Sequence, residues 1–271
     1  MDFTLNTVRD VSFLTCDHFD RAGGVAHGFS TRLGGVSEGV HSGLNLGYNR
    51  GDDPDHVREN FRLFCCAIGA DYNGLVKTRQ VHRDHVQPVT AADRGMDLIS
   101  PAPWETDGLV TDVPGVCLTI FSADCVPVLL YDPVRRCIAA VHSGWRGTAL
   151  SIARVGVDRM VKDYGCRPDH ILAAIGPAIS KCCFETHADV PDEMITCLGA
   201  PIVSFIEELP GGKFRVDLKG IIQNTLLRSG LDPAHIAVSD HCTTCRTDLY
   251  WSHRLLGNQR GSMAAMIQLT K

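Results

Sequence analysis

Residues 122–146 read SADCVPVLLYDPVRRCIAAVHSGWR and contain two short apolar runs on either side of a turn-forming Asp-Pro pair. The runs, residues 126–131 and 137–141, are aliphatic and too short for helices, which predicts two buried strands joined as a hairpin. Pairing around a turn at residues 132–135 places Cys125 opposite His142. Directly opposed residues on one sheet face have Cβ atoms about 4.5–5.5 Å apart, so we expect a thiol beside an imidazole at the open end of the hairpin. A slip of one residue would separate them onto opposite faces.

The segment after His142 is predicted to leave the sheet and begin a helix. The sequence SGWRG, residues 143–147, precedes residues 148–164, in which apolar side chains recur at three- and four-residue spacing until Gly165. The N-terminus of a helix carries unpaired N–H groups that favour an anion. We therefore expect an anion-binding helix N-terminus after Gly147, close to His142.

The rest of the chain contains short strands and helices in an irregular order. Residues 1–26 are predicted to form a first strand and turn, and the polar, glycine-rich residues 27–49 a long loop of a kind that is usually functional. We expect one α+β domain over residues 1–271, with mixed β-sheets flanked by helices. Helices are predicted from Asp53-Pro54 to Gly69, over residues 190–198, and from Asp217 to Gly230; strands are predicted at residues 86–89, 109–110, 116–121, 171–175, 213–216, 236–238 and 264–269.

The composition argues against several classes of partner. The 271-residue chain is 44% apolar, has a net charge of −5 and contains no basic block, which argues against nucleic acid or a membrane surface as a ligand. No apolar run reaches the ~18 residues of a membrane-spanning helix, and the first residues lack the pattern of a secretory signal. We therefore expect a cytoplasmic protein whose 12 cysteines are mostly reduced. The adjacent pairs Cys65-Cys66 and Cys182-Cys183 are interpreted as small buried apolar residues.

Three interpretations fit Cys125 and His142. They are a structural pair, a nucleophilic Cys–His dyad, or two ligands of a metal ion that needs a third. Catalytic zinc usually has three protein ligands and an open fourth position, from which it polarises a substrate oxygen or activates water. His82, in Gln80-Val81-His82, is the candidate third ligand, and His85 competes with it. Asp124, next to the thiol, is a candidate acid–base group.

Two arginines and one cysteine pair have both functional and structural interpretations. Arg32 lies in a glycine-rich loop and Arg146 follows His142, so either guanidinium could bind phosphate or carboxylate or simply be solvated. Cys242-x-x-Cys245 is the spacing of a redox or zinc half-site. Because Cys182-Cys183 and His241 are badly spaced for a second half, we do not expect an independent zinc site there.

Taken together, these motifs resemble the YfiH/YlmD family, formerly called laccase-domain or polyphenol oxidase proteins. The resemblance runs over nearly the whole chain. The sequence departs from the family pattern at Ser143, where Ala is frequent, and at His253, where Tyr is frequent. The motifs that carry the resemblance are His27-Gly28-Phe29-Ser30-Thr31-Arg32, Gly34-Gly35-Val36-Ser37, Leu44-Asn45-Leu46-Gly47, Gln80-Val81-His82, Thr106-Asp107-Gly108, Ala123-Asp124-Cys125-Val126-Pro127-Val128, His142-Ser143-Gly144-Trp145-Arg146-Gly147, Ile175-Gly176-Pro177-Ala178-Ile179, Cys182-Cys183 and Ser252-His253-Arg254.

The resemblance implies a fold, a metal and an activity. The fold would be α+β, related to cysteine-hydrolase toxins, in a monomer or small homo-oligomer. His82, Cys125 and His142 would bind one Zn²⁺, with copper as the alternative metal. The substrates would be purine nucleosides and phosphate, with phosphorolysis of adenosine, inosine and methylthioadenosine and deamination of adenosine. Candidate substrate-binding residues are Arg32, Asn45 and Arg146.

Three other functions remain open at this point. A metal-free hydrolase would use Cys125 as nucleophile and His142 as base. Copper-dependent phenol oxidation needs several His-x-His pairs, and the sequence contains none. A nucleotide-sensing or scaffold protein would bind a nucleoside without turning it over.

Overall fold

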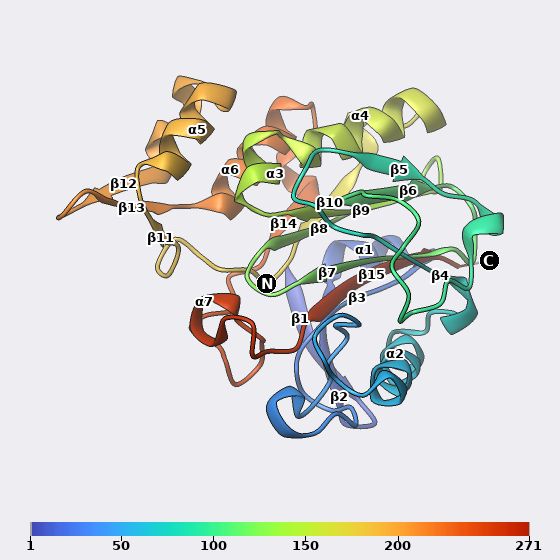
Figure 1. The fold of residues 1–271 in the computed structure, drawn as a ribbon. Helices are drawn as coiled ribbons and strands as arrows, with labels where there is room; N and C mark the ends of the chain where they lie inside the picture. The colour runs from blue at the N-terminus through green and yellow to red at the C-terminus, as the bar shows by residue number, and fades with distance from the viewer. Residues whose placement is uncertain (1, 271) are drawn as a thin grey trace.

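The computed structural model describes residues 2–270, so residues 1 and 271 of the predicted domain lie outside the described range. Its strands form two six-stranded sheets and one small sheet of three strands (Figure 1). The first large sheet has the order β1 (Phe3–Val8), β2 (Val11–Cys16), β3 (Val25–Ser30), β15 (Met263–Leu269), β7 (Cys117–Ser122), β4 (Leu75–Lys77). The second has the order β14 (Ile236–Val238), β10 (Leu172–Ile175), β8 (Val126–Asp132), β9 (Cys137–Ser143), β6 (Gly108–Thr111), β5 (Val86–Pro88).

Helices cover the outer faces of the two stacked sheets, which gives an α+β arrangement of four layers (Figure 1). Helix α2 (Pro54–Ile68) packs on the first sheet, and α4 (Ile152–Tyr164) and α6 (Leu218–Arg228) pack on the second. The small sheet, of order β11 (Glu185–Thr186), β13 (Lys213–Val216), β12 (Ile206–Leu209), lies on one side with α5 (Asp189–Leu198). The remaining helices are α1 (Asp17–Ala22), α3 (Trp145–Ala149) and α7 (His253–Leu256). No helix within residues 2–270 is long and apolar enough to cross a membrane.

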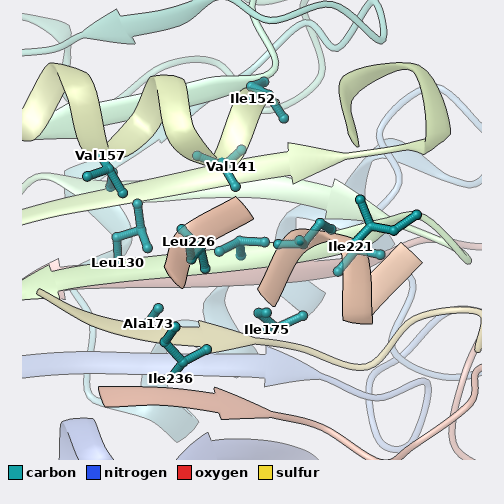
Figure 2. Close-up of a cluster of buried hydrophobic side chains, with 14 of the residues drawn as sticks. Leu130, Val141, Ile152, Val157, Ala173, Ile175, Ile221, Leu226 and Ile236 are labelled. Atoms are coloured by element: carbon teal, nitrogen blue, oxygen red, sulfur yellow. The ribbon is translucent and has the colours of Figure 1, made fainter. Parts of the chain in front are cut away.

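The hydrophobic core lies in three layers, one between the sheets and one under each helical cover. Leu118 of β7, Leu129 of β8 and Ile267 of β15 are fully buried in the layer between the sheets. Figure 2 shows the layer beneath α4 and α6, where Val157 and Leu226 meet the aliphatic side chains of the second sheet. Burial of this kind contributes about 25 cal/mol per Å² of apolar surface. The sheets therefore provide a rigid platform for the loops at their ends.

The predicted hairpin is present as β8 and β9 at the centre of the second sheet, but its register differs from the prediction. His142 pairs with Pro127 rather than with Cys125, because the four-residue turn begins at Pro133 rather than at Asp132, one position later than expected. Asp132 and Cys137 are the last paired residues, and the Asp132 carboxylate accepts the backbone N–H groups of Val134 and Arg135. The shift is two residues, an even number, so side chains that were expected to share a face still do.

The predicted helix over residues 148–164 is divided into two helices, and the first of them begins earlier than expected. Helix α3 starts at Trp145, with Gly144 as its N-cap, and ends before a left-handed Ser151 (φ 59°). Helix α4 then continues to Tyr164, and Gly165 ends it as predicted. The expected anion-binding helix N-terminus after Gly147 is therefore wrong, because Gly147 lies inside α3.

The N-terminal prediction was also incomplete. Residues 3–22 form two strands and a helix rather than one strand, because Arg9 and Asp10 both adopt positive φ values and close a tight β1–β2 hairpin. Such turns usually contain Asn-Gly or Asp-Gly, and this one does not. The predicted loop at residues 27–49 begins later than expected, since residues 27–30 belong to β3.

A candidate metal centre at the end of the central hairpin

Three side chains from distant parts of the chain converge where β8 begins and β9 ends. The ligand atoms of His82, Cys125 and His142 all lie within 4.8 Å of one another, and Cys125 Sγ is 3.9 Å from His82 Nε2. Nitrogen and sulfur bonded to one tetrahedral zinc would be about 3.6 Å apart, given Zn–N and Zn–S bonds of ~2.0–2.3 Å. The donor set and its spacing therefore fit a Cys/His₂ metal site. His85, the predicted competitor, points instead to the Glu105 carbonyl, which is 3.2 Å from its Nδ1.

His142 is oriented by a buried carboxylate. Its Nδ1 lies 2.8 Å from Asp107 Oδ1, so the proton on Nδ1 is shared with the carboxylate and Nε2 is left for a ligand. This carboxylate–histidine arrangement is the usual outer shell of a metal-ligating imidazole. Burial lowers the pKa of His142, but the Cys125 thiolate and Asp107 outweigh it and raise that pKa to about 9.

Asp107 also shapes the loop that presents His82. Its two oxygens accept the backbone N–H groups of Val81, His82 and Arg83 at 2.9–3.0 Å. His82 consequently adopts a positive φ of 60°, which is uncommon for a residue with a Cβ. Burial would raise the pKa of Asp107, but His142 and these amides hold it below its usual value. One carboxylate thus fixes two of the three candidate ligands, a role that the sequence analysis missed.

Cys125 has the properties of a reactive thiol. It is half-buried at the start of β8. Its surroundings would raise the pKa by desolvation, but the positive charge and hydrogen bond of His142, with a smaller contribution from His82, lower the pKa to about 6. A thiolate is the form that binds metals and also the form that attacks electrophiles. The electrostatics of the site therefore fit both a metal ligand and a nucleophile.

The absence of a side chain at Gly144 leaves room for His82 and Cys125. A Cβ at this position would lie 2.9 Å from His82 Cδ2 and 3.1 Å from Cys125 Sγ. The backbone itself is ordinary, with φ −69° and ψ 174°, so glycine is needed for its size and not for its torsion angles.

We therefore expect Gly144→Ala to lower activity by about 10²-fold with little loss of stability, because a ligand displaced by a fraction of an ångström no longer has productive geometry. The measurements are kcat/KM, zinc content and thermal unfolding of the purified variant. Gly147→Ala is the matched control, since its Cβ would come no closer than 3.3 Å to any atom, the nearest being the Ile152 side chain, and would meet none of the three ligand side chains. Equal activity in the two variants would contradict this steric account of the site.

A pocket of about 480 Å³ lies next to the candidate ligands. Of the predicted substrate-binding residues, Arg146 lines this pocket together with His82, and its guanidinium stacks on Trp145 at 4.1 Å from the ring centroid. The remaining lining residues are Val81, Arg83, Leu150 and Glu193. The exposed Arg146 thus shares one open pocket with a candidate ligand.

Arg32 and Asn45 are committed to other contacts. Arg32 stacks on Trp251 at 3.8 Å from the ring centroid and donates to the Thr247 carbonyl. Asn45 is fully buried; its amide donates to Asp52 and its Oδ1 accepts from the backbone of Gly47 and Ser262. The structure gives Asn45 the contacts of a residue that orders the loop after β3.

Asp124 is buried and fully hydrogen-bonded. Its Oδ1 accepts from the Thr243 hydroxyl at 2.7 Å, and its Oδ2 accepts from the Ser252 hydroxyl at 3.0 Å and the Arg254 amide at 2.6 Å. Its φ is +86°, in the left-handed region. Asp124 therefore ties the loop before Cys125 to the C-terminal part of the chain.

Buried Arg260, near the thiol, and half-buried Arg50, beside Arg260, escaped the sequence analysis. Arg260 is only 6% exposed, and its Nε has no hydrogen-bond partner within residues 2–270, which is also true of Arg50 Nε. Burial, with a smaller contribution from the positive charge of Arg50, lowers the pKa of Arg260 to about 10. The charges of Asp124 and Cys125 act in the opposite direction. No local pattern pointed to them, because neither residue belongs to a motif and the two lie 210 positions apart in the sequence.

The structure contradicts the interpretation of Cys182 and Cys183 as buried apolar residues. Cys182 is exposed and Cys183 half-buried, and their sulfurs lie within 4.8 Å of those of Cys242 and Cys245. The spacing that argued against a four-cysteine group was misleading, because parallel pairing of β10 with β14 brings the two segments together.

The fold and the site define an α+β protein with stacked mixed sheets and a Cys/His₂ candidate metal centre beside an open pocket. Residues 26–270 match the family model described as multi-copper polyphenol oxidoreductase laccase. The crystal structure of a Bacillus licheniformis hypothetical protein YfiH superimposes with a TM-score of 0.92 at 34% identity, covering 99% of each chain. The chain therefore belongs to the YfiH/YlmD family, as the motifs predicted, and the α+β prediction is confirmed.

Curated relatives of the chain are enzymes by name. Purine nucleoside phosphorylase YlmD of Geobacillus stearothermophilus is 36% identical, covering 94% of this chain and 93% of the relative. A purine nucleoside phosphorylase of Deinococcus radiodurans is 39% identical, covering 91% and 90%. Adenosine deaminase RL5, from an unknown prokaryotic organism, is 32% identical, covering 86% and 90%.

Proposed function

We propose that this protein is a zinc-dependent purine nucleoside phosphorylase, acting on adenosine, inosine and methylthioadenosine, that also deaminates adenosine. The observation that carries the proposal is the convergence of His82, Cys125 and His142 beside the open pocket that Arg146 lines. The names of the relatives supply the substrate class. We further propose that the chain acts as one domain, and in the cytoplasm, where exposed thiols stay reduced.

His82, Cys125 and His142 would hold the metal, and Asp107 would keep His142 and the His82 loop in place. A bound zinc ion would supply Lewis acidity at its open position. The same three side chains would also bind copper, which is the alternative metal. The sequence has no His-x-His pair, so we do not propose multicopper phenol oxidation despite the description of the family model.

Phosphorolysis needs an anion held against the ribose C1′. A phosphate oxygen bonds to C1′ as the C1′–N9 bond breaks, and the purine leaves with the electron pair and gains a proton. We assign phosphate binding to Arg146, which lines the pocket, with the positive charge of buried Arg260 near Cys125 as a longer-range contribution. Guanidinium groups suit this role because their N–H groups match phosphate oxygens in pairs. Arg32, whose guanidinium is stacked on Trp251, would have a secondary role in phosphate binding.

Asp124 has a positioning role in this proposal. The sequence suggested an acid–base group, but both of its oxygens already accept hydrogen bonds within the protein. These three hydrogen bonds hold the carboxylate in one orientation between the loop before Cys125 and the C-terminal part of the chain. We therefore assign Asp124 to fixing the Cys125 loop.

Incubation of the purified protein with adenosine, with and without phosphate, tests the proposal. We expect adenine and ribose 1-phosphate only when phosphate is present, and inosine in both cases. Separating adenine, inosine and hypoxanthine by chromatography distinguishes the two reactions. His85→Ala is the matched control for His82→Ala, because it changes a neighbouring imidazole outside the site. Failure to release base from adenosine or inosine in the presence of phosphate would refute the phosphorylase assignment.

One alternative has direct support from the electrostatics. The pKa of Cys125 near 6 also suits a metal-free Cys–His hydrolase with Cys125 as nucleophile and His142 as base. Metal analysis separates the two functions, because the hydrolase needs no metal and would leave the thiolate open to alkylation. Stoichiometric zinc that protects Cys125 from alkylation favours the phosphorylase.

A further inference from the structure

A second group of metal-binding side chains lies outside the candidate active site. Cys182 and Cys183 follow β10, and Cys242 and Cys245 follow β14. Strands β10 and β14 are parallel neighbours, and a bridge between Ala178 and Cys242 extends their pairing, so the two loops leave the same edge of the sheet. Cys245 thereby contacts Cys182 and Cys183, which lie 63 and 62 positions before it in the chain.

The distances within this four-cysteine group are those of a metal tetrahedron. Cys182 Sγ lies 3.7 Å from both Cys183 Sγ and Cys245 Sγ, and Cys183 Sγ lies 3.4 Å from Cys245 Sγ. The sulfur of Cys242 is within 4.8 Å of all three. Four sulfurs bonded to one zinc at ~2.3 Å are separated by tetrahedral edges of about 3.8 Å. The group therefore has room for one ion and little else.

The surroundings supply the outer-shell contacts that a tetrathiolate site needs. Cys242 Sγ accepts the backbone N–H of Ser180 at 3.4 Å, so one sulfur is already oriented by the facing loop. A divalent ion with four thiolates carries a net charge of −2. Lys219 is buried beside the Cys242 loop, where its ammonium donates to the carbonyls of Ser239 and His241. Arg254 donates to the Cys183 carbonyl at 3.1 Å. Both cations offset that charge.

We propose that Cys182, Cys183, Cys242 and Cys245 bind a structural Zn²⁺, distinct from the ion proposed at the active site. Tetrahedral S₄ sites take zinc or iron, and zinc fits a site with no electron-transfer role. All four positions are filled by protein, which is the mark of a structural rather than a catalytic zinc. A single ion would use all four sulfurs at once, whereas one disulfide would use only two of them.

Hydrogen bonds connect the proposed structural zinc site to the candidate active site. Thr243, between two of its ligands, donates through its hydroxyl to Asp124, and its backbone N–H donates to the Ala178 carbonyl. Asp124 immediately precedes Cys125, and its carbonyl accepts the Ile179 amide. Loading the four-cysteine site would therefore hold the two loops that support Cys125.

The zinc content per chain tests this inference. It is measured by elemental mass spectrometry on protein purified without tags or added metal. We expect two zinc ions in the wild type and one in Cys182→Ser or Cys245→Ser, which replace exposed side chains. Cys66→Ser and Cys197→Ser, at exposed cysteines outside the group, should keep two ions. Cys125→Ala should lose the other ion, so the two sites fail independently and the active-site proposal is judged separately.

A second measurement keeps the test decisive if a serine variant misfolds. Alkylation of the native wild type before and after chelation, followed by peptide mass spectrometry, should show all four thiols protected only before chelation. Three results would each overturn the assignment: iron in place of zinc, a disulfide between Cys183 and Cys245, or alkylation of the four thiols to the same extent before and after chelation.

Discussion

Cys125→Ala is expected to lower kcat/KM for inosine phosphorolysis by about 10³-fold or more, because metal Lewis acidity contributes several kcal/mol to catalysis. The variant should also lose one zinc per chain, since two imidazoles alone hold the ion weakly. It should fold normally, because the half-buried thiol immediately precedes β8, at the end of a strand, and lies outside the core. Steady-state kinetics, zinc analysis and thermal unfolding check the three parts.

The control variant is Cys66→Ala, which removes an exposed thiol from α2 and should change none of these quantities. Chelation of the wild type distinguishes a ligand from a nucleophile. If Cys125 is a ligand, chelation should reduce activity to the level of the variant, and added zinc should restore it. A chelated enzyme that stays fully active while Cys125→Ala is inactive would support the metal-free hydrolase instead.

The centre of this fold was predictable because its signals are local. Two aliphatic runs around Asp132-Pro133 specify the β8–β9 hairpin, and the Asp53 cap with Pro54 and Gly69 specifies α2. The register was wrong by two residues, since Asp132 belongs to β8 and its carboxylate accepts from the turn amides, so the four-residue turn begins one position later. The shared face of Cys125 and His142 survived because a strand repeats every two residues.

The remaining site features depend on long-range contacts that no local pattern encodes. His82 rather than His85 reaches the site because Asp107, which immediately precedes β6, accepts from three consecutive amides of the His82 loop. The four-cysteine group arises from the parallel pairing of β10 with β14. Both strands were predicted, but their adjacency was not, because strand order is set by packing of the whole sheet.

Asp107→Asn should weaken the candidate metal centre without changing any ligand. The carboxylate accepts from His142 Nδ1 and from three backbone amides, so an asparagine must turn its own N–H₂ toward two of these donors. Each buried donor left without an acceptor costs roughly 1–3 kcal/mol, and loss of such outer-shell contacts typically lowers metal affinity 10–100-fold. We expect lower thermal stability, weaker zinc binding in a competition assay, and a parallel loss of kcat/KM.

Asp132→Asn is the matched control for this variant, because Asp132 is an equally buried carboxylate in β8, at the turn end of the β8–β9 hairpin away from Cys125. Its Oδ1 accepts from Val134 and Arg135, and its Oδ2 has no partner within residues 2–270, so an asparagine amide replaces an oxygen that bonds to nothing. Zinc affinity should therefore stay at the wild-type value. If Asp107→Asn matches this control in zinc affinity and differs from it only in stability, Asp107 has a role in the fold but none in metal binding. His142 would then be oriented by its strand rather than by the carboxylate.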